Sequence, residues 1–424
     1  IITLKNVMNK REFIQKFGLA GLATYSLSND IIYDKYKLNL PPFKAENDLW
    51  EVVRSHYSLK PDYINLENGY YNIIPDPTLY KYIEYVKTIN FEGSYYMRNS
   101  LEDDNLKLRK RISDWLSCDK KNIIVTRNTT ESLDLIIGGY PWEKGDEAIY
   151  AHQDYGSMKL MFDQVTKKYN IKTKVISIPN HPSSDEEIVR LYENQITKKT
   201  RLLMVCHMIN ITGQVLPVKK ICEMAHSYGV EVMVDGAHCI GHFDFSIENL
   251  NCDYYGSSLH KWLSAPLGAG LLYIKEKHIS KIWPLLAGHS NDFSGIKRLN
   301  HMGTNPVQIH LAINNALDYI DWIGIKRKEK RLKELQNHWI QNLKNVSNVE
   351  INTPLSFSKS FGIGNIGIKN MPPKIMAEQL LKKFNIFTVA IDYANVKGCR
   401  ITPNIYNSIE EIDIFIDAVT KLAS

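Results

Sequence analysis

The chain has 424 residues, more than one hydrophobic core usually serves, so we expect two domains. Hydrophobic residues make up 44% and charged residues 23%, which is typical of globular proteins and excludes a disordered chain. The net charge of +6 comes from interleaved acids and bases, with one basic run, KRKEKRLKELQ, near residue 326. Its glutamates and helical spacing favour a solvated helix face over a nucleic-acid patch. We therefore expect no nucleic-acid partner. No apolar run is long enough to span a membrane, so we expect no membrane partner either.

The N-terminal residues 1–40 form an extension with its own character. The stretch MNKREFIQKFGLAGLATYSLS, residues 8–28, has a basic start at Lys10 and Arg11 and then a mildly apolar run of small residues. It resembles a twin-arginine export signal in which lysine replaces one arginine. The alternative is a short amphipathic surface helix. Export to the periplasm is expected in the first case, and a cytoplasmic protein in the second.

After a connector at residues 41–60, short apolar runs alternate with helical patterns over residues 61–305. NIIVT precedes TTESLDLIIGGY, EAIYAH precedes GSMKLMFDQVTKKY, and RLLMVCHM precedes VKKICEMAHSYG. Strands that alternate with helices of ten or more residues indicate crossover units and a large, mainly parallel sheet. After Pro306 two long helical patterns lead into shorter strands and helices, which predicts a smaller α+β domain over residues 306–424. The fold class is therefore α/β.

Two charged residues stand at the ends of predicted strands. Asp235 follows the buried run EVMV, and Lys261, in SSLHKW, begins the turn between the runs NCDYYGSSL and AGLLYI. Ligands of open α/β sheets gather at the carboxyl ends of the strands. Pyridoxal 5′-phosphate needs a lysine amine for its Schiff base and a carboxylate against its pyridine nitrogen. Alone, an aspartate and a lysine are more often a salt bridge.

A phosphate site is indicated by TRNTTES, which follows one strand and opens a helix. Asn128 can cap that helix, with Glu131 three residues on as in a capping box, and the amides of Thr129 and Thr130 then face an anion. The plain alternative is a capped helix without a ligand. Further predicted cofactor contacts come from other strand ends: Ser258 and His260 as phosphate donors, and Tyr155 as a ring that stacks on the cofactor.

The motifs TRNTTES, HQDYGS, HMINITGQVLP, VDGAH, SSLHKW and GT, in this order, resemble the class V aminotransferase family. The resemblance runs from about residue 60 to the C-terminus and is strongest to the isopenicillin N epimerase-like branch, through LENGYYNIIP and RITPNIYNSIEEID. It implies a fold-type I pyridoxal phosphate enzyme with a seven-stranded-type sheet, acting as a homodimer on an amino acid or small amine.

The resemblance also implies residue roles. Lys261 is then the Schiff-base lysine, Asp235 the pyridine partner, and Asn210 and His238 neighbours of the ring's 3′-oxygen. Thr304 is implied to reach the phosphate in the neighbouring subunit. Arg400 is implied to grip the substrate carboxylate through a bidentate pair, because no acid adjoins it in sequence; the alternative is a salt bridge to an acid elsewhere in the fold. A lysine held as a neutral imine is easier to bury than an ammonium.

Several readings stay open at this point. Aminotransfer is the leading reaction, with racemase, epimerase or lyase chemistry as rivals and a non-catalytic cofactor-binding protein as the alternative outside enzymes. Cysteine desulfurase is disfavoured because residues 345–375 contain no cysteine, and the six cysteines are expected to be free, buried thiols. GIGNIG at residues 362–367 alternates like a strand and is not expected to bind a dinucleotide. His242 is expected to pack rather than bind a metal.

Overall fold

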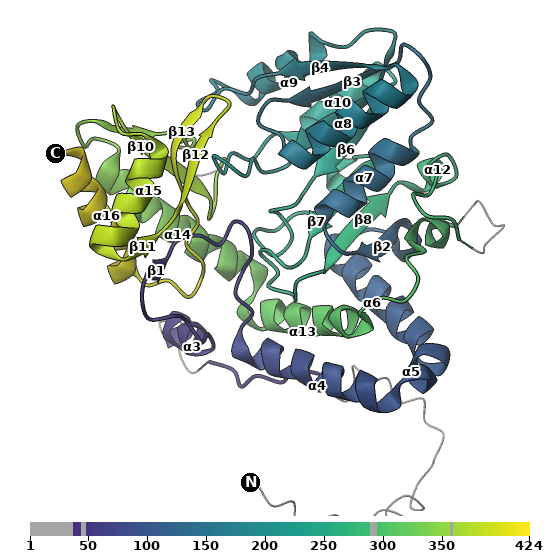
Figure 1. Ribbon diagram of the computed structural model, residues 1–424, viewed down its shortest axis with the longest axis horizontal. Helices are drawn as coiled ribbons and strands as arrows, with labels where there is room; N and C mark the ends of the chain where they lie inside the picture. The colour runs from purple at the N-terminus through teal and green to yellow at the C-terminus, as the bar shows by residue number, and fades with distance from the viewer. Residues whose placement is uncertain (1–36, 44–47, 289–294, 357–358) are drawn as a thin grey trace, which may run out of the picture.

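The computed structural model describes residues 37–43, 48–288, 295–356 and 359–424 (Figure 1). The predicted export signal at residues 8–28 lies outside these ranges. A large sheet with helices on both faces lies beside a smaller unit built from the C-terminal part of the chain (Figure 1). In the described part of the chain, no helix is both long and apolar enough to cross a membrane.

The large sheet has seven strands in the order β2-β8-β7-β6-β5-β3-β4. All neighbours are parallel except β8, which runs antiparallel to both β2 and β7, so the predicted mainly parallel sheet is confirmed. The strands are β2 (Ile123–Thr126), β3 (Glu147–Ala151), β4 (Lys172–Ile176), β5 (Thr200–Cys206), β6 (Glu231–Asp235), β7 (Tyr254–Ser258) and β8 (Gly270–Ile274).

The central strands are buried on both faces because helices cover both. On β5, Leu203 and Val205 belong to one core and Leu202 and Met204 to the other, as the period of two in a strand requires. The first core receives α6 (Leu101–Leu116), α9 (Asp185–Glu193), α10 (Val218–Ser227) and α13 (Val307–Ile323). The second core receives α7 (Thr129–Gly139) and α8 (Gly156–Tyr169).

The smaller unit is a four-stranded antiparallel sheet in the order β12-β13-β10-β9 with helices packed on it. Trp339 and Phe415, fully buried, anchor its core. Its elements are α14 (Ile325–Leu343), β9 (Val349–Ile351), β10 (Gly364–Ile368), α15 (Pro373–Phe384), β11 (Ile386–Phe387), β12 (Val389–Tyr393), β13 (Val396–Ile401) and α16 (Ile409–Ala423). The strand assignment of GIGNIG is thereby confirmed.

Eight further elements complete the described part. They are α3 (Leu49–Ser55), β1 (Ile64–Asn65), α4 (Asp76–Glu92), α5 (Ser94–Asn99), η2 (Lys120–Asn122), α11 (Ile247–Leu250), α12 (Glu276–Ile279) and η3 (Ile296–Asn300). Figure 1 shows α4 running alongside α13 below the large sheet, and the two helices share the small core around Tyr85 and Leu311.

Packing departs from the sequence-based domain boundaries in two places. β1 pairs with β11, so the segment after residue 61 lies beside the smaller unit and not on the large sheet. Conversely, α13 follows Pro306 but packs on the large sheet through residues such as Ile313 and Leu317, and its other apolar residues, such as Leu311, face the core shared with α4. Strand β13, which carries Arg400, was not predicted.

Candidate functional site

A cavity of about 310 Å³ opens where β5, β6 and β7 end. This is the carboxyl edge at which parallel sheets bind ligands. Ten of the eleven predicted site residues line it: Thr129, Thr130, Tyr155, Asn210, Asp235, His238, Ser258, His260, Lys261 and Arg400. Residues from both the large sheet and β13 therefore meet in one space.

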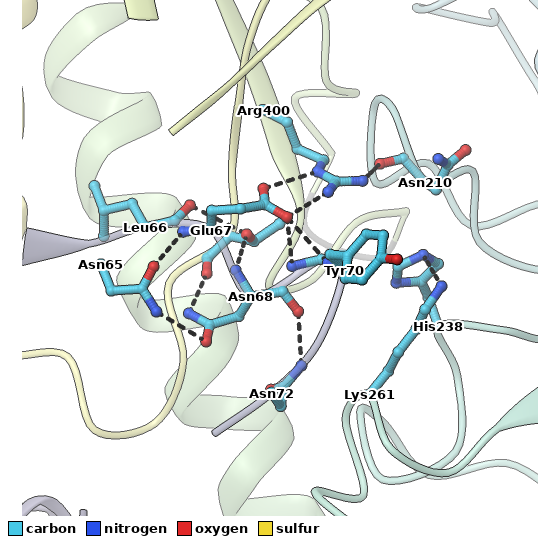
Figure 2. Close-up of polar contacts among 12 residues, drawn as sticks. Asn65, Leu66, Glu67, Asn68, Tyr70, Asn72, Asn210, His238, Lys261 and Arg400 are labelled. Atoms are coloured by element: carbon cyan, nitrogen blue, oxygen red, sulfur yellow. Dashed lines mark hydrogen bonds and ion pairs between the residues drawn. The ribbon is translucent and has the colours of Figure 1, made fainter. Parts of the chain in front are cut away.

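Lys261 lies in the turn that follows β7, with its side chain partly buried in the cavity. Its Nζ lies 3.1 Å from Nε2 of His238 (Figure 2). Burial lowers the pKa of the Lys261 amine to about 8, against an opposing effect of Asp235. A lysine whose pKa falls this far is partly neutral near neutral pH, and a neutral amine is a nucleophile.

Asp235 ends β6 and is buried at the floor of the cavity. Its Oδ1 accepts a hydrogen bond of 3.0 Å from the Ala237 amide, which holds the carboxyl group in place. Burial raises the pKa of this carboxyl group, and the amide and Lys261 act against that rise. A cation placed against Asp235, such as a protonated ring nitrogen, would stabilise its charged form.

The N-terminus of α7 forms the polar end of the cavity. Asn128 Oδ1 accepts a 2.9 Å bond from the Glu131 amide, so the predicted cap is confirmed. The reciprocal half of a capping box is not made, because the Glu131 carboxylate accepts from the Arg127 amide instead. The Thr129 amide donates to Ser258 Oγ at 3.0 Å, and the two hydroxyl groups lie 2.7 Å apart. These hydroxyls and the helix N-terminus suit an anion.

This donor set fits pyridoxal phosphate on chemical grounds. The cavity offers an amine with a lowered pKa, a buried carboxylate, and hydroxyl and amide donors at a helix N-terminus. Those are the groups that the aldehyde, the pyridine nitrogen and the phosphate ester require. Tyr155 precedes the first residue of α8, lines the cavity and is half exposed, so its ring is placed to stack on a flat ligand.

Arg400 has a different partner from the one expected from the sequence. The guanidinium was expected to await a substrate carboxylate, but it forms a bidentate ion pair with Glu67, with Nε to Oε2 at 3.2 Å and Nη2 to Oε1 at 2.5 Å (Figure 2). The expectation of an unpartnered guanidinium is therefore wrong, and the alternative of an internal salt bridge describes the structure. Nη1 donates to the backbone oxygen of Asn210 at 3.2 Å.

Residues of the LENGYYNIIP segment were missed as parts of the site. Gly69 and Tyr70 line the cavity, and Glu67 stands behind them. Glu67 precedes Arg400 by 333 positions, so no local pattern pairs them. The feature of the sequence that could have indicated this contact is the glycine at position 69. A Cβ there would come within 2.5 Å of the Arg400 guanidinium carbon, so only glycine lets the two segments approach this closely.

Two other predicted features lie outside the cavity. Thr304 is exposed and does not line the cavity of its own chain, so its role in a neighbouring subunit stays a prediction. His242 is packed, as expected: it stacks on Trp262 with ring centroids 3.7 Å apart and accepts a 2.8 Å bond from the Gly362 amide.

Curated proteins from three organisms have sequences similar to between 61% and 88% of this chain. Isopenicillin N epimerase of Streptomyces clavuligerus is 24% identical over 88% of this chain and 98% of its own length, and the enzyme of Amycolatopsis lactamdurans is 25% identical over 88% and 98%. A probable cysteine desulfurase of Halalkalibacterium halodurans is 28% identical over 61% of this chain and 65% of its own.

Among solved structures, the apo cysteine desulfurase of Thermococcus onnurineus NA1 superposes with a TM-score of 0.78 at 22% identity. It covers 91% of this chain and 99% of its own length, and it shows the same fold. The family model for aminotransferase class-V matches residues 72–415. The chain therefore belongs to the class-V aminotransferase family, and pyridoxal 5′-phosphate is the cofactor of its site.

Proposed function

We propose that this protein is an enzyme that transfers the amino group of an amino acid or related small amine, working as a homodimer. The observation that carries the proposal is the placement of Lys261, whose amine faces His238 in a cavity that also holds Asp235. When bound, pyridoxal phosphate supplies an aldehyde for the amine and a ring that accepts the electron pair released at the substrate's Cα.

The residues of this chain would divide the remaining work. Lys261 would hold the cofactor covalently and, once released, move the proton at Cα. Asp235 would keep the ring nitrogen protonated, and Thr129, Thr130, Ser258 and His260 would bind the phosphate. His238 and Asn210 would face the oxygen side of the ring. These assignments rest on the cavity geometry and on family membership.

Epimerisation is the second candidate, and the similarity to two isopenicillin N epimerases over 88% of the chain favours it. A cysteine desulfurase is less well supported. Cys399 is buried on β13 in contact with the Pro373 carbonyl oxygen, and burial raises the pKa of its thiol to about 12, which disfavours the reactive thiolate. Cys206 lines the cavity, and burial raises the pKa of its thiol as well, to well above the ordinary range.

A half-reaction screen separates these functions. The purified holoprotein is mixed with L-amino acids, D-amino acids and simple amines, one at a time, in deuterated buffer. Aminotransfer predicts a change in cofactor absorbance with stoichiometric release of a ketoacid or aldehyde. Epimerisation predicts deuterium at Cα and interconversion of the L and D forms without such release. An unchanged cofactor spectrum with every compound would contradict both and leave a cofactor-binding protein.

A further inference from the structure

Glu67 is held rigidly against the guanidinium of Arg400. Besides its two bonds from Arg400, its Oε1 accepts bonds from the amides of Gly69 at 3.1 Å and Tyr70 at 3.0 Å. Both side chains of the pair are less than a tenth exposed. A carboxylate with four donors, two of them from a guanidinium, has its hydrogen-bonding capacity nearly filled.

The backbone around Glu67 is fixed as well. Residue 67 forms a parallel bridge with Thr402, and the Thr402 amide donates to the Leu66 oxygen at 2.8 Å. The Asn68 amide donates to the Thr402 hydroxyl at 2.6 Å. The residues on both sides of Glu67 are therefore hydrogen-bonded to Thr402, which stands two positions after Arg400 in the chain.

The pair uses the part of Arg400 that a carboxylate ligand would use. A guanidinium has five N–H groups, and a carboxylate binds best through two parallel ones. Glu67 takes the fork formed by Nε and Nη2, while Nη1 already serves the Asn210 oxygen. Displacing Glu67 would leave a buried carboxylate without its cation, which is costly.

The Glu67–Arg400 ion pair also brings no net charge to the cavity. Arg400 lines the cavity and Glu67 does not, yet the two act on Lys261 in opposite directions: Arg400 lowers the pKa of its amine and Glu67 raises it. An arriving carboxylate would thus meet a guanidinium whose charge is already compensated.

We propose that Glu67 determines substrate specificity: it occupies Arg400 as a fixed internal carboxylate, so that the site gains little from a carboxylate on the substrate and accepts amines that lack one. This deepens the proposed function and rests on it for the view that amines enter this cavity. It differs from a gate, because Glu67 stays in place when the ligand binds.

Ligands that cannot react with the cofactor test the proposal directly. Propionate and its neutral counterpart propionamide are titrated into the holoprotein by calorimetry. In the wild-type protein the two should bind within about threefold of each other. In Glu67→Gln, which keeps an oxygen for the two amides but removes the charge, propionate should bind about tenfold more tightly or better, and propionamide should not change.

Two further variants test whether the increase in propionate affinity acts through Arg400. The double variant Glu67→Gln, Arg400→Met should not show the increase, because the guanidinium that would bind propionate is gone. Glu334→Gln removes the same charge from an exposed carboxylate that pairs with the buried Arg331 and does not line the cavity, and it should leave both affinities unchanged. Unchanged or weaker propionate binding in Glu67→Gln overturns the proposal, the weaker case meaning that Glu67 orients Arg400 for the substrate.

The wild-type comparison stands even if Glu67→Gln does not fold. A wild-type protein that prefers propionate to propionamide by more than about thirtyfold has an available guanidinium, and the proposal fails. Neither ligand carries an amine, so these results do not depend on the half-reaction screen. A silent screen with the expected propionate result would remove the proposed function and leave the role of Glu67 intact.

Discussion

The amine of Lys261 and the imidazole of His238 are in direct contact, with Nζ 3.1 Å from Nε2. The indole nitrogen of Trp262, which can only donate, lies 3.2 Å from the other ring nitrogen, Nδ1. Burial and the charge of Lys261 lower the pKa of His238 well below its usual range, so the ring is neutral. A neutral ring that accepts at Nδ1 carries its proton at Nε2, and Nε2 then donates to a neutral Lys261 amine.

Cofactor capture by the apoprotein should therefore follow the lowered pKa of Lys261. Only the neutral amine attacks an aldehyde, and the amine becomes neutral as the pH rises through its pKa, here about 8 instead of 10.5. The rate of covalent attachment should rise with pH and level off above about 8. Stopped-flow absorbance with added pyridoxal phosphate, confirmed by borohydride reduction and peptide mapping, measures it.

Pyridoxamine phosphate serves as the control ligand, since it has no aldehyde and its affinity should not follow this curve. Lys261→Ala should still fold and should carry no reduced cofactor. A rate that continues to climb toward pH 10.5 would show that the pKa of Lys261 is not lowered in the folded protein, and a label on another lysine would remove Lys261 from its role.

Two adjacent serines on β7 separate cofactor binding from stability. Ser258 Oγ contacts Thr129 in the cavity, whereas Ser257 Oγ donates to the Gly236 oxygen at 2.8 Å and does not line the cavity. Ser258→Ala should raise the cofactor Kd about tenfold, the size of a hydrogen bond to a charged group. Ser257→Ala should destabilise the fold about as much as Ser258→Ala does, but it should leave the cofactor Kd unchanged. Equal Kd values in the two variants would show that Ser258 does not contact the phosphate.

Local patterns predicted the parts of the site that depend on neighbours in sequence. Asp235 ends an apolar strand and Asn128 caps the helix after another, and each position follows from periodicity and capping alone. The Glu67–Arg400 pair depends on β1 and β13 lying near each other, which tertiary packing decides. β13 itself was missed because VKGCRI interrupts its apolar residues with Lys397, Gly398 and Arg400.

Lys328 is a second buried lysine, and it should make stability depend on pH. Its Nζ donates to the Trp262 carbonyl oxygen, and burial lowers its pKa from 10.5 to about 7. Between pH 7 and 10.5 the unfolded chain binds a proton that the folded protein has released. The cost of burying Lys328 therefore grows as the pH falls through this window and is complete below about 7.

Lys328→Met removes that cost, which is on the order of 3–5 kcal/mol when Lys328 is fully protonated. The substitution also leaves the Trp262 oxygen without its donor, which costs about 1–3 kcal/mol. In urea unfolding, the stability of Lys328→Met relative to wild type should be about 3 kcal/mol more favourable at pH 7 than at pH 10. Lys330→Met, on the exposed side of the same helix, should show no such difference. A pH-independent effect of Lys328→Met would show that the ammonium is not destabilised by burial.

Thr304 offers a test of a site shared between two subunits, because it is exposed and does not line the cavity of its own chain. If it reaches the phosphate in the neighbouring subunit, Thr304→Arg homodimers should hold little cofactor, and Lys261→Ala homodimers should hold none covalently. A heterodimer of the two variants, isolated with different tags, has one complete site: Lys261 from one chain and Thr304 from the other. Borohydride reduction should label about one lysine per heterodimer.

The control is a heterodimer that carries both substitutions on one chain and is paired with a wild-type chain. It contains the same two substitutions but has no complete site, so it should remain unlabelled. Thr304 acting within its own chain reverses the two results, and a monomer with full cofactor binding removes the shared site altogether.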